Sequence, residues 1–213
     1  MEDVLDVYQR PYNPEFPVVC FDESSKQLIG EVKAPIPMTT NHPKLQDDEY
    51  VRNGVAEILL SVEPLAGQRH IEITSTRTRI DWAGYVKEMV DERYANAKKV
   101  VLVMDNLNTH SVASLYEAFS PEEAHRIAQR LEIHYTPKHG SWLNIAEIEL
   151  AALKVGCLER RIPDISTMKK EVDAWTEERN NKFCGVDWHF DVGMARKKLK
   201  HIYPAFYKEK DSN

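Results

Sequence analysis

Residues 100–106, Val-Val-Leu-Val-Met-Asp-Asn, limit the possible folds more than any other stretch of the sequence. The run is short and apolar and it ends on a carboxylate, which is typical of a fully buried strand in a parallel or mixed sheet. Residues 16–23 have the same form and end on Asp22 and Glu23. Open α/β sheets bind ligands beyond the carboxyl ends of their strands. The two runs therefore predict neighbouring strands that bring two carboxylates to one sheet edge.

The rest of the chain changes from strand patterns to helix patterns at about residue 80. We expect strands at 17–22, 27–31, 55–62, 69–76, 100–104 and 131–135. We expect helices at 82–90, 111–119, 121–131 and 142–158, and one from Asp164 or Ser166 to about Asn180. Antiparallel hairpins followed by crossovers predict an α/β fold with a mixed five-stranded sheet flanked by helices. This is the ribonuclease H-like arrangement.

The length of 213 residues favours one domain. We assign this domain to residues 16–207, with a polar lead-in at 1–15 and a polar tail at 208–213. Residues 34–49 are rich in proline and show no period, so we expect a long loop there, and such loops are often functional.

Composition excludes several classes of protein. No apolar stretch approaches the roughly 20 residues that cross a membrane, and the acidic N-terminus does not resemble a secretory signal. Three widely spaced cysteines argue against a disulfide framework, so we expect a cytoplasmic location. The net charge of −6 is unlike that of a nucleic-acid-binding protein. If the chain acts on DNA, another domain, a second subunit or a metal must help to hold the DNA.

A third carboxylate should come from the helix after the last strand. Glu147 and Glu149 both lie there, but two residues on a helix point about 200° apart, so only one can face the site. Glu147 lies on the face that we expect to pack on the core, and we choose it. Together with Asp22 and Asp105 it would form a set of three acids.

Three carboxylates without matching cations repel one another, and a hard divalent ion relieves this repulsion. Oxygen ligands suit Mg²⁺ or Mn²⁺, and two such ions about 3.5–4 Å apart can promote the cleavage of a phosphodiester. Each acid alone is more simply a turn residue or a solvated side chain. The set of three in this topology favours the metal site.

Several polar and aromatic residues flank these acids. His110 and His139 could contact phosphate, although each could equally be an ordinary loop residue. We expect Trp142 to be a core residue rather than a platform on which bases stack.

Three motifs resemble those of the mariner-related bacterial insertion-sequence transposases, which belong to the DDE superfamily (IS six-thirty type). Val-Cys-Phe-Asp-Glu at 19–23 is similar to the first motif, and Asp-Asn-Leu-Asn-Thr-His at 105–110 to the second. Tyr-Thr-Pro-Lys-His-Gly-Ser-Trp-Leu-Asn-Ile-Ala-Glu at 135–147 is similar to the third. The resemblance covers about residues 14–204 and implies a metal-dependent core that cuts and rejoins DNA at transposon ends.

The resemblance also implies roles for individual residues. Asp22, Asp105 and Glu147 match the three catalytic acids. Other residues match motif positions that could contact DNA or support the acids: Asn106, His110, His139 and Asn144. The implied partners are transposon-end and target DNA, a second copy of the chain and a separate helix-turn-helix DNA-binding subunit.

The chain departs from the family pattern in two ways. Members usually carry a helix-turn-helix region before the catalytic core, and we find none here. Forty-one residues, 106–146, separate Asp105 from Glu147, which is longer than is typical for the family. We expect the added residues to form the helix at 120–130 on the periphery.

Two classes of function follow. The first is a transposase catalytic domain that performs DNA cleavage and strand transfer. The second is an inactive or recruited core that only binds a partner or dimerises. A structure-selective nuclease of the same fold would share the acids but would give no reason for the third motif.

Overall fold

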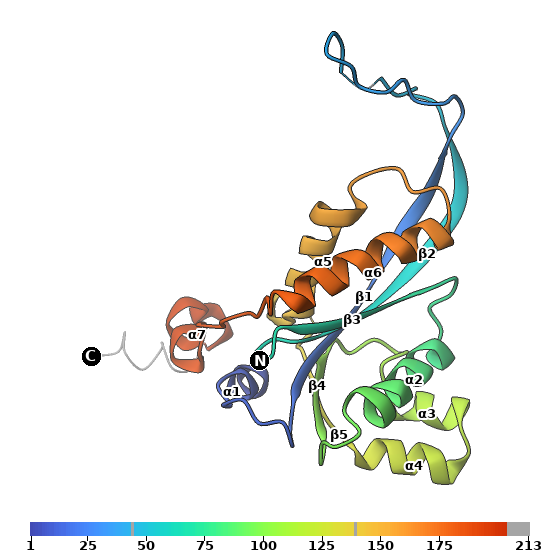
Figure 1. The fold of residues 1–213 in the computed structure, drawn as a ribbon. Helices are drawn as coiled ribbons and strands as arrows, with labels where there is room; N and C mark the ends of the chain where they lie inside the picture. The colour runs from blue at the N-terminus through green and yellow to red at the C-terminus, as the bar shows by residue number, and fades with distance from the viewer. Residues whose placement is uncertain (44, 139, 204–213) are drawn as a thin grey trace.

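A computed structural model describes residues 1–43, 45–138 and 140–203, and it is built on one five-stranded sheet (Figure 1). The strands are β1 (Val18–Glu31), β2 (Tyr50–Glu63), β3 (Gln68–Thr74), β4 (Val100–Met104) and β5 (Leu131–Tyr135). Their order across the sheet is β3-β2-β1-β4-β5. The first three strands pair antiparallel, whereas β4 pairs parallel with both β1 and β5. The prediction of a mixed five-stranded sheet is confirmed.

Helices cover both faces of this sheet, and helices α5 and α6 lie on the opposite side from α2, α3 and α4 (Figure 1). The α-helices are α1 (Glu2–Tyr8), α2 (Arg79–Glu88), α3 (Val112–Ala118), α4 (Pro121–Gln129), α5 (Ala146–Leu153), α6 (Ile165–Asn181) and α7 (Val192–Lys198). Shorter helical segments are η1 (Met89–Arg93), η2 (Ser141–Leu143), η3 (Lys154–Leu158) and η4 (Lys200–Ile202). Among the described residues, no helix is long and apolar enough to cross a membrane.

Alternation along the strands divides the core into two clusters, one on each face. Cys20 and Val103 belong to the cluster that includes residues of α5 and α6. Val19, Phe21 and Leu102 belong to the cluster that includes residues of α2, α3 and α4. Successive side chains of a strand point to opposite faces, so this division fixes the face on which each later residue of β1 lies.

The first strand differs from its predicted form. We expected it to end at Asp22, with a separate strand at 27–31, but β1 is continuous through Glu31. It pairs with β2 over that whole length, with one irregularity between Gln27 and Ile29. Asp22 therefore lies inside a strand. The parallel pairing with β4, however, ends just before it, at Cys20.

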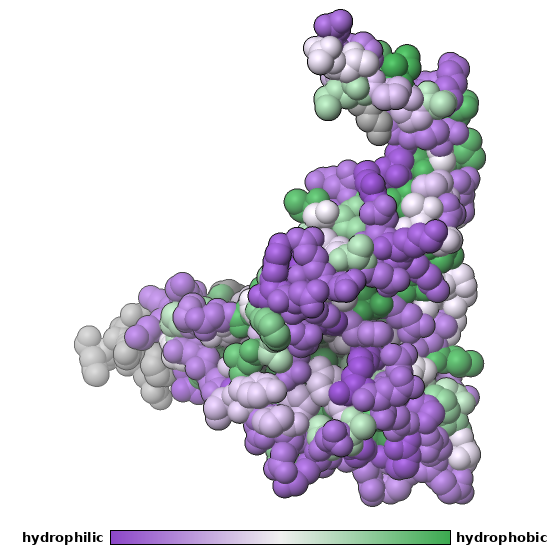
Figure 2. Space-filling view, in the orientation of Figure 1, coloured by the Kyte–Doolittle hydropathy of each residue, from purple (hydrophilic) through white to green (hydrophobic). Residues whose placement is uncertain are grey.

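Beyond the sheet, β1 and β2 continue as a hairpin that projects from the body (Figure 1). The described residues of the connecting segment form isolated bridges, Ile36 with Leu45 and Thr39 with His42, and no regular strand, so the predicted long loop is largely confirmed. The base of the hairpin is tied to the body by Arg161, whose Nη1 lies 2.6 Å from Glu31 Oε2. In Figure 2 most of the face in view is hydrophilic, and hydrophobic side chains occur on the hairpin, where Met38 is 75% exposed.

The N-terminal residues also differ from prediction. We described 1–15 as a polar lead-in, but residues 2–8 form α1, and its Val4 and Leu5 are fully buried in the core cluster that also includes residues of α5. Three apolar residues in a seven-residue helix gave too short a pattern to recognise. The predicted tail at 208–213 lies outside the described residues.

Candidate active site

The pairing of β1 with β4 brings two of the predicted acids together. Cys20 pairs with Val103 in parallel register. Asp22 and Asp105 each lie two residues further along, at the same level of the sheet. Side chains two residues apart point to the same face, so both aspartates lie on the face of Cys20 and Val103, which is the face that α5 covers.

Glu147 comes to this face on the first turn of α5. The start of the helix is fixed to β1 by Asn144, which is 1% exposed. Its Nδ2 donates to the Phe21 carbonyl at 2.8 Å, and its Oδ1 accepts from the Ala146 N–H at 3.2 Å. Because Phe21 directly precedes Asp22, one amide side chain sets the position of α5 relative to the first aspartate.

The other glutamate of α5 has a different environment. Glu149 is 1% exposed and lies between two arginines. Arg69 Nε is 3.1 Å from its Oε2, and Arg179 Nη2 is 2.9 Å from its Oε1. Glu149 is thus neutralised in the core, while Glu147 is half-buried and stays on the side of the aspartates. The choice of Glu147 as the third acid stays a prediction.

Electrostatics show that the three acids lie near one another. Burial raises the pKa of Asp22 to about 6, and the negative charges of Asp105 and Glu147 add to this effect. The Glu23 N–H, which donates to Asp22 Oδ1 at 2.8 Å, and the charge of His110 act in the opposite direction. No Lys or Arg of the described chain is among the groups that act most strongly on Asp22. The negative charge at this edge therefore favours the binding of a cation.

The donor set fits a hard divalent cation, because it consists of carboxylate oxygens from two strands and a helix. As the side chains stand, no three His, Cys, Asp or Glu residues within the described ranges are arranged to hold a metal ion. Mg²⁺ usually keeps several waters and takes only one or two carboxylates. An open group of acids suits such an ion better than a closed cage would.

His110 lies in the segment after β4 and contacts the second aspartate. Its Nδ1 is 2.5 Å from Asp105 Oδ1, and its Nε2 is 3.0 Å from Glu23 Oε1, outside hydrogen-bond geometry. The ring is fully buried between Phe21, edge-on at a centroid distance of 5.2 Å, and Trp82, stacked at 6.1 Å. A direct contact of His110 with DNA phosphate is therefore incompatible with its position, and the supporting role that we also considered is the one that its contacts favour.

The charges around His110 favour its protonated form. Burial alone would lower its pKa, but the hydrogen bond to Asp105 and the charge of Glu23 outweigh burial and raise the pKa to about 9.

The other predicted residues have mixed outcomes. Asn106 is exposed, directly after Asp105, and is open to a ligand. His139 lies outside the described residues. Trp142 was expected in the core, but it is 45% exposed on η2 and contacts Phe190 in a T-shaped arrangement, at a centroid distance of 5.6 Å. That prediction was wrong, because the apolar pattern of 142–158 does not reveal that the chain turns before α5 begins.

Sequence reasoning missed Glu23 as a member of this site. Its side chain is 1% exposed and lies near Arg77, whose Nε is 3.4 Å from Glu23 Oε2. The sequence offered one indication: Glu23 directly follows Asp22 and therefore lies on the opposite face of β1.

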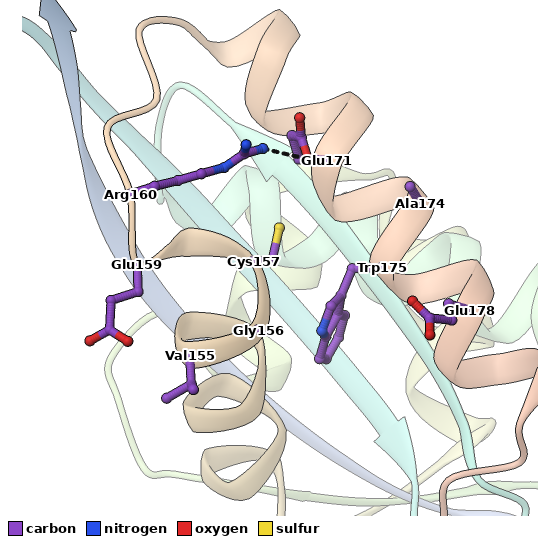
Figure 3. A pocket seen from close by; sticks show the side chains of 9 residues that line it. All are labelled: Val155, Gly156, Cys157, Glu159, Arg160, Glu171, Ala174, Trp175 and Glu178. Atoms are coloured by element: carbon purple, nitrogen blue, oxygen red, sulfur yellow. Dashed lines mark ion pairs between the residues drawn. The ribbon is translucent and has the colours of Figure 1, made fainter. Parts of the chain in front are cut away.

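A surface groove lies away from the acids. It has a volume of about 400 Å³ between η3 and α6, and Figure 3 shows Trp175 and the ion pair of Arg160 with Glu171 lining it. None of Asp22, Asp105 or Glu147 contributes to its wall. The site is instead an open group of carboxylates at a sheet edge, as expected for a macromolecular substrate.

The fold and the site together define a nuclease-type domain of the ribonuclease H-like class. The sequence pattern of the DDE superfamily endonucleases matches residues 17–169, which is more than half of the chain. The chain belongs to the DDE superfamily endonuclease family. A search of curated proteins finds no matching relative.

Among solved structures the chain is similar to those of the Mos1 mariner transposase. It matches the Mos1 mariner paired-end complex with Mn at 14% identity and a TM-score of 0.53, covering 88% of this chain and 61% of that chain. It matches the Mos1 strand transfer complex at 14% identity and a TM-score of 0.59, covering 86% and 54%. These similarities confirm the ribonuclease H-like fold. The chain spans a little over half of the length of these structures.

Proposed function

We propose that this chain is a transposase catalytic core that cleaves DNA phosphodiester bonds at transposon ends and transfers the resulting strands. One observation carries the proposal: Asp22 and Asp105, from adjacent parallel strands, and Glu147, from the helix over the same face, converge at one sheet edge. Membership of the DDE superfamily endonucleases supports it. So does the similarity of the fold to a transposase whose structures are described as paired-end and strand transfer complexes.

The proposal includes two divalent cations, Mg²⁺ or Mn²⁺. Asp22, Asp105 and Glu147 would hold these ions. Such ions activate the attacking oxygen and stabilise the leaving oxygen of a phosphodiester. The raised pKa of Asp22, about 6, supports this assignment because a bound cation would relieve the repulsion that contributes to it.

A surface that fits DNA lies beside the start of α5. Trp142 is exposed and contacts Phe190, and Lys198 Nζ lies 5.9 Å from the centre of the Phe190 ring. Exposed aromatic rings next to cationic side chains stack on bases and neutralise phosphates. Because Trp142 precedes Glu147 by five residues, a DNA end held on this surface would lie close to the acids.

Other parts of the proposal concern partners. The net charge of −6 leaves little general attraction for DNA. A homodimer and a separate helix-turn-helix subunit would supply further contacts to DNA. The bacterial insertion-sequence origin and the IS six-thirty type belong to the same proposal and rest on the three motifs, whereas the cytoplasmic location rests on the three widely spaced cysteines.

The test is a nicking assay on supercoiled plasmid that carries candidate transposon ends, with Mn²⁺ and with EDTA. Wild-type protein should nick in Mn²⁺ only, and Asp105→Asn should abolish nicking while its circular dichroism spectrum stays unchanged. Asp173→Asn is the matched control, because Asp173 is exposed on α6 and should be dispensable. Equal nicking by Asp105→Asn and wild type would refute the proposal. Mn²⁺ binding without nicking would instead favour a core that only binds a partner.

A further inference from the structure

Glu23 and Asp22 are adjacent but lie on opposite faces of β1. Asp22 shares the face of Cys20, whereas Glu23 shares the face of Val19 and Phe21. A residue on the face of Val19 and Phe21 could not reach the proposed metal site directly. His110 connects the two, because its ring contacts Glu23 with one nitrogen and Asp105 with the other.

The burial of the Glu23 carboxylate costs free energy of folding. Within the described part of the chain, both of its carboxylate oxygens are buried without a hydrogen-bond partner. Its charged neighbours are His110 Nε2 at 3.0 Å and Arg77 Nε at 3.4 Å. A buried carboxylate without hydrogen bonds destabilises a protein, and a native exception requires an explanation. A role in the site supplies one.

The geometry also shows what such a role would be. The imidazole of His110 is held between Phe21 and Trp82, so its direction is fixed. It binds only Oδ1 of Asp105, and Oδ2 makes no hydrogen bond with any described residue. Metal-binding carboxylates are oriented by outer partners of this kind, whose loss typically lowers metal affinity about 10- to 100-fold.

We infer that Glu23 is a positioning residue that acts through His110 to hold the Asp105 carboxylate ready for a divalent cation. The inference rests on the proposed function. It gives a role to Glu23, whose burial neither the fold nor the three acids explain. Glu23 itself does not touch the metal or the DNA.

The test measures Mn²⁺ affinity by isothermal titration calorimetry in the absence of DNA. Glu23→Gln keeps the shape of the side chain and should weaken Mn²⁺ binding about 10- to 100-fold. His110→Phe should weaken it similarly, and the double variant should be no weaker than His110→Phe alone, because Glu23 acts through His110. Thermal unfolding without metal should show that Glu23→Gln still folds, so that a weaker Mn²⁺ affinity does not reflect loss of the fold.

Glu149→Gln is the matched control, since Glu149 lies two residues from Glu147 and its side chain is as buried as that of Glu23. It contacts Arg69 and Arg179 and not His110, so it should lower the unfolding temperature and leave Mn²⁺ affinity unchanged. If Glu149→Gln does not fold, Arg179→Lys tests the same cluster with a milder change.

Three outcomes overturn the inference. Wild-type Mn²⁺ affinity in Glu23→Gln would do so while leaving the proposed function intact, provided that Asp105→Asn abolishes binding. Additive effects of Glu23→Gln and His110→Phe would show that Glu23 does not act through His110. Mn²⁺ binding that is insensitive to Asp105→Asn would overturn both this inference and the proposed metal site.

Discussion

Cys20 of β1 and Val103 of β4 are paired in parallel register, and each lies two residues before one of the two aspartates of the site. A slip of this register by one residue would turn one aspartate to the opposite face. The position of the site therefore depends on the pairing of two apolar residues in the core, and not on any contact between the acids, which repel each other. Substitutions in the scaffold should consequently affect the site by changing the positions of its acids.

Asn144 is the side chain that joins α5 to β1. Asn144→Ala would remove its bonds to the Phe21 carbonyl and the Ala146 N–H and leave these groups unpaired in the core. We expect a loss of about 1–3 kcal/mol in the free energy of unfolding, measured by urea denaturation. Asn108→Ala, at an exposed position, is the control and should change little. An unchanged urea midpoint for Asn144→Ala would contradict the anchoring role.

The Arg69, Glu149 and Arg179 cluster should be essential for stability. Glu149→Leu would leave the Arg69 side chain, which is 0% exposed, without its buried partner. We expect a loss of about 3–5 kcal/mol in unfolding free energy, measured by chemical denaturation. Breaking the exposed pair of Glu178 and Lys182 with Glu178→Gln should have almost no effect. Comparable losses in both variants would show that burial is not the cause.

His70 should make the fold sensitive to mild acid. Burial, together with the positive charge of Arg93, lowers its pKa to about 4, whereas Asp173 acts in the opposite direction. Glu88 lies 3.4 Å away, but His70 is neutral at pH 7, so this contact is not an ion pair there.

The unfolded chain takes up a proton on His70 near pH 6.5, its ordinary pKa, before the folded chain does. The contribution of His70 is therefore complete above this pH and is lost as the pH falls from about 6.5 to about 4. His70→Gln does not titrate, so its unfolding free energy should fall less steeply over that window. Parallel curves for His70→Gln and wild type would refute this prediction.

Trp142 should contribute to binding of a DNA end. Trp142→Ala would remove an exposed ring beside α5 and should weaken binding of a single-stranded oligonucleotide by about 1–3 kcal/mol, the usual contribution of stacking on one base. Fluorescence anisotropy in EDTA would measure binding without cleavage. Phe183→Ala, at a ring that is 72% exposed elsewhere, is the control. Trp142→Phe should retain most of the affinity, and a full loss in Trp142→Phe would argue against stacking.

Local sequence patterns predicted most of the scaffold. The apolar run at 100–104 is a strand of that length, and the strand at 131–135 and the helix beginning at Pro121 also match. Helix α4 packs on α3 and β5 at the edge of the molecule, as expected for an added segment (Figure 1). These elements were predictable because each signal lies within the element itself: a period, a cap or a proline.

Elements whose signals depend on distant residues were not predictable. Residues 2–8 form a core helix because their apolar side chains pack on the sheet face that carries Cys20 and Val103. The helix α2 begins at Arg79, after the cap Thr78 and with Asp81 completing a capping box, and not at residue 82 as expected. Residue 142 was assigned to the core from helical spacing, but a short turn before α5 directs its ring outward.

The sequence by itself predicted the three acids, their order and the strands and helix that carry them, because apolar runs and helical faces are local patterns. Only the tertiary structure decided which other residues lie against these acids. Glu23 and His110 are 87 positions apart and meet because β4 lies beside β1 and the segment after β4 folds over the second face. Such a contact depends on register and packing between distant segments, which no local period records.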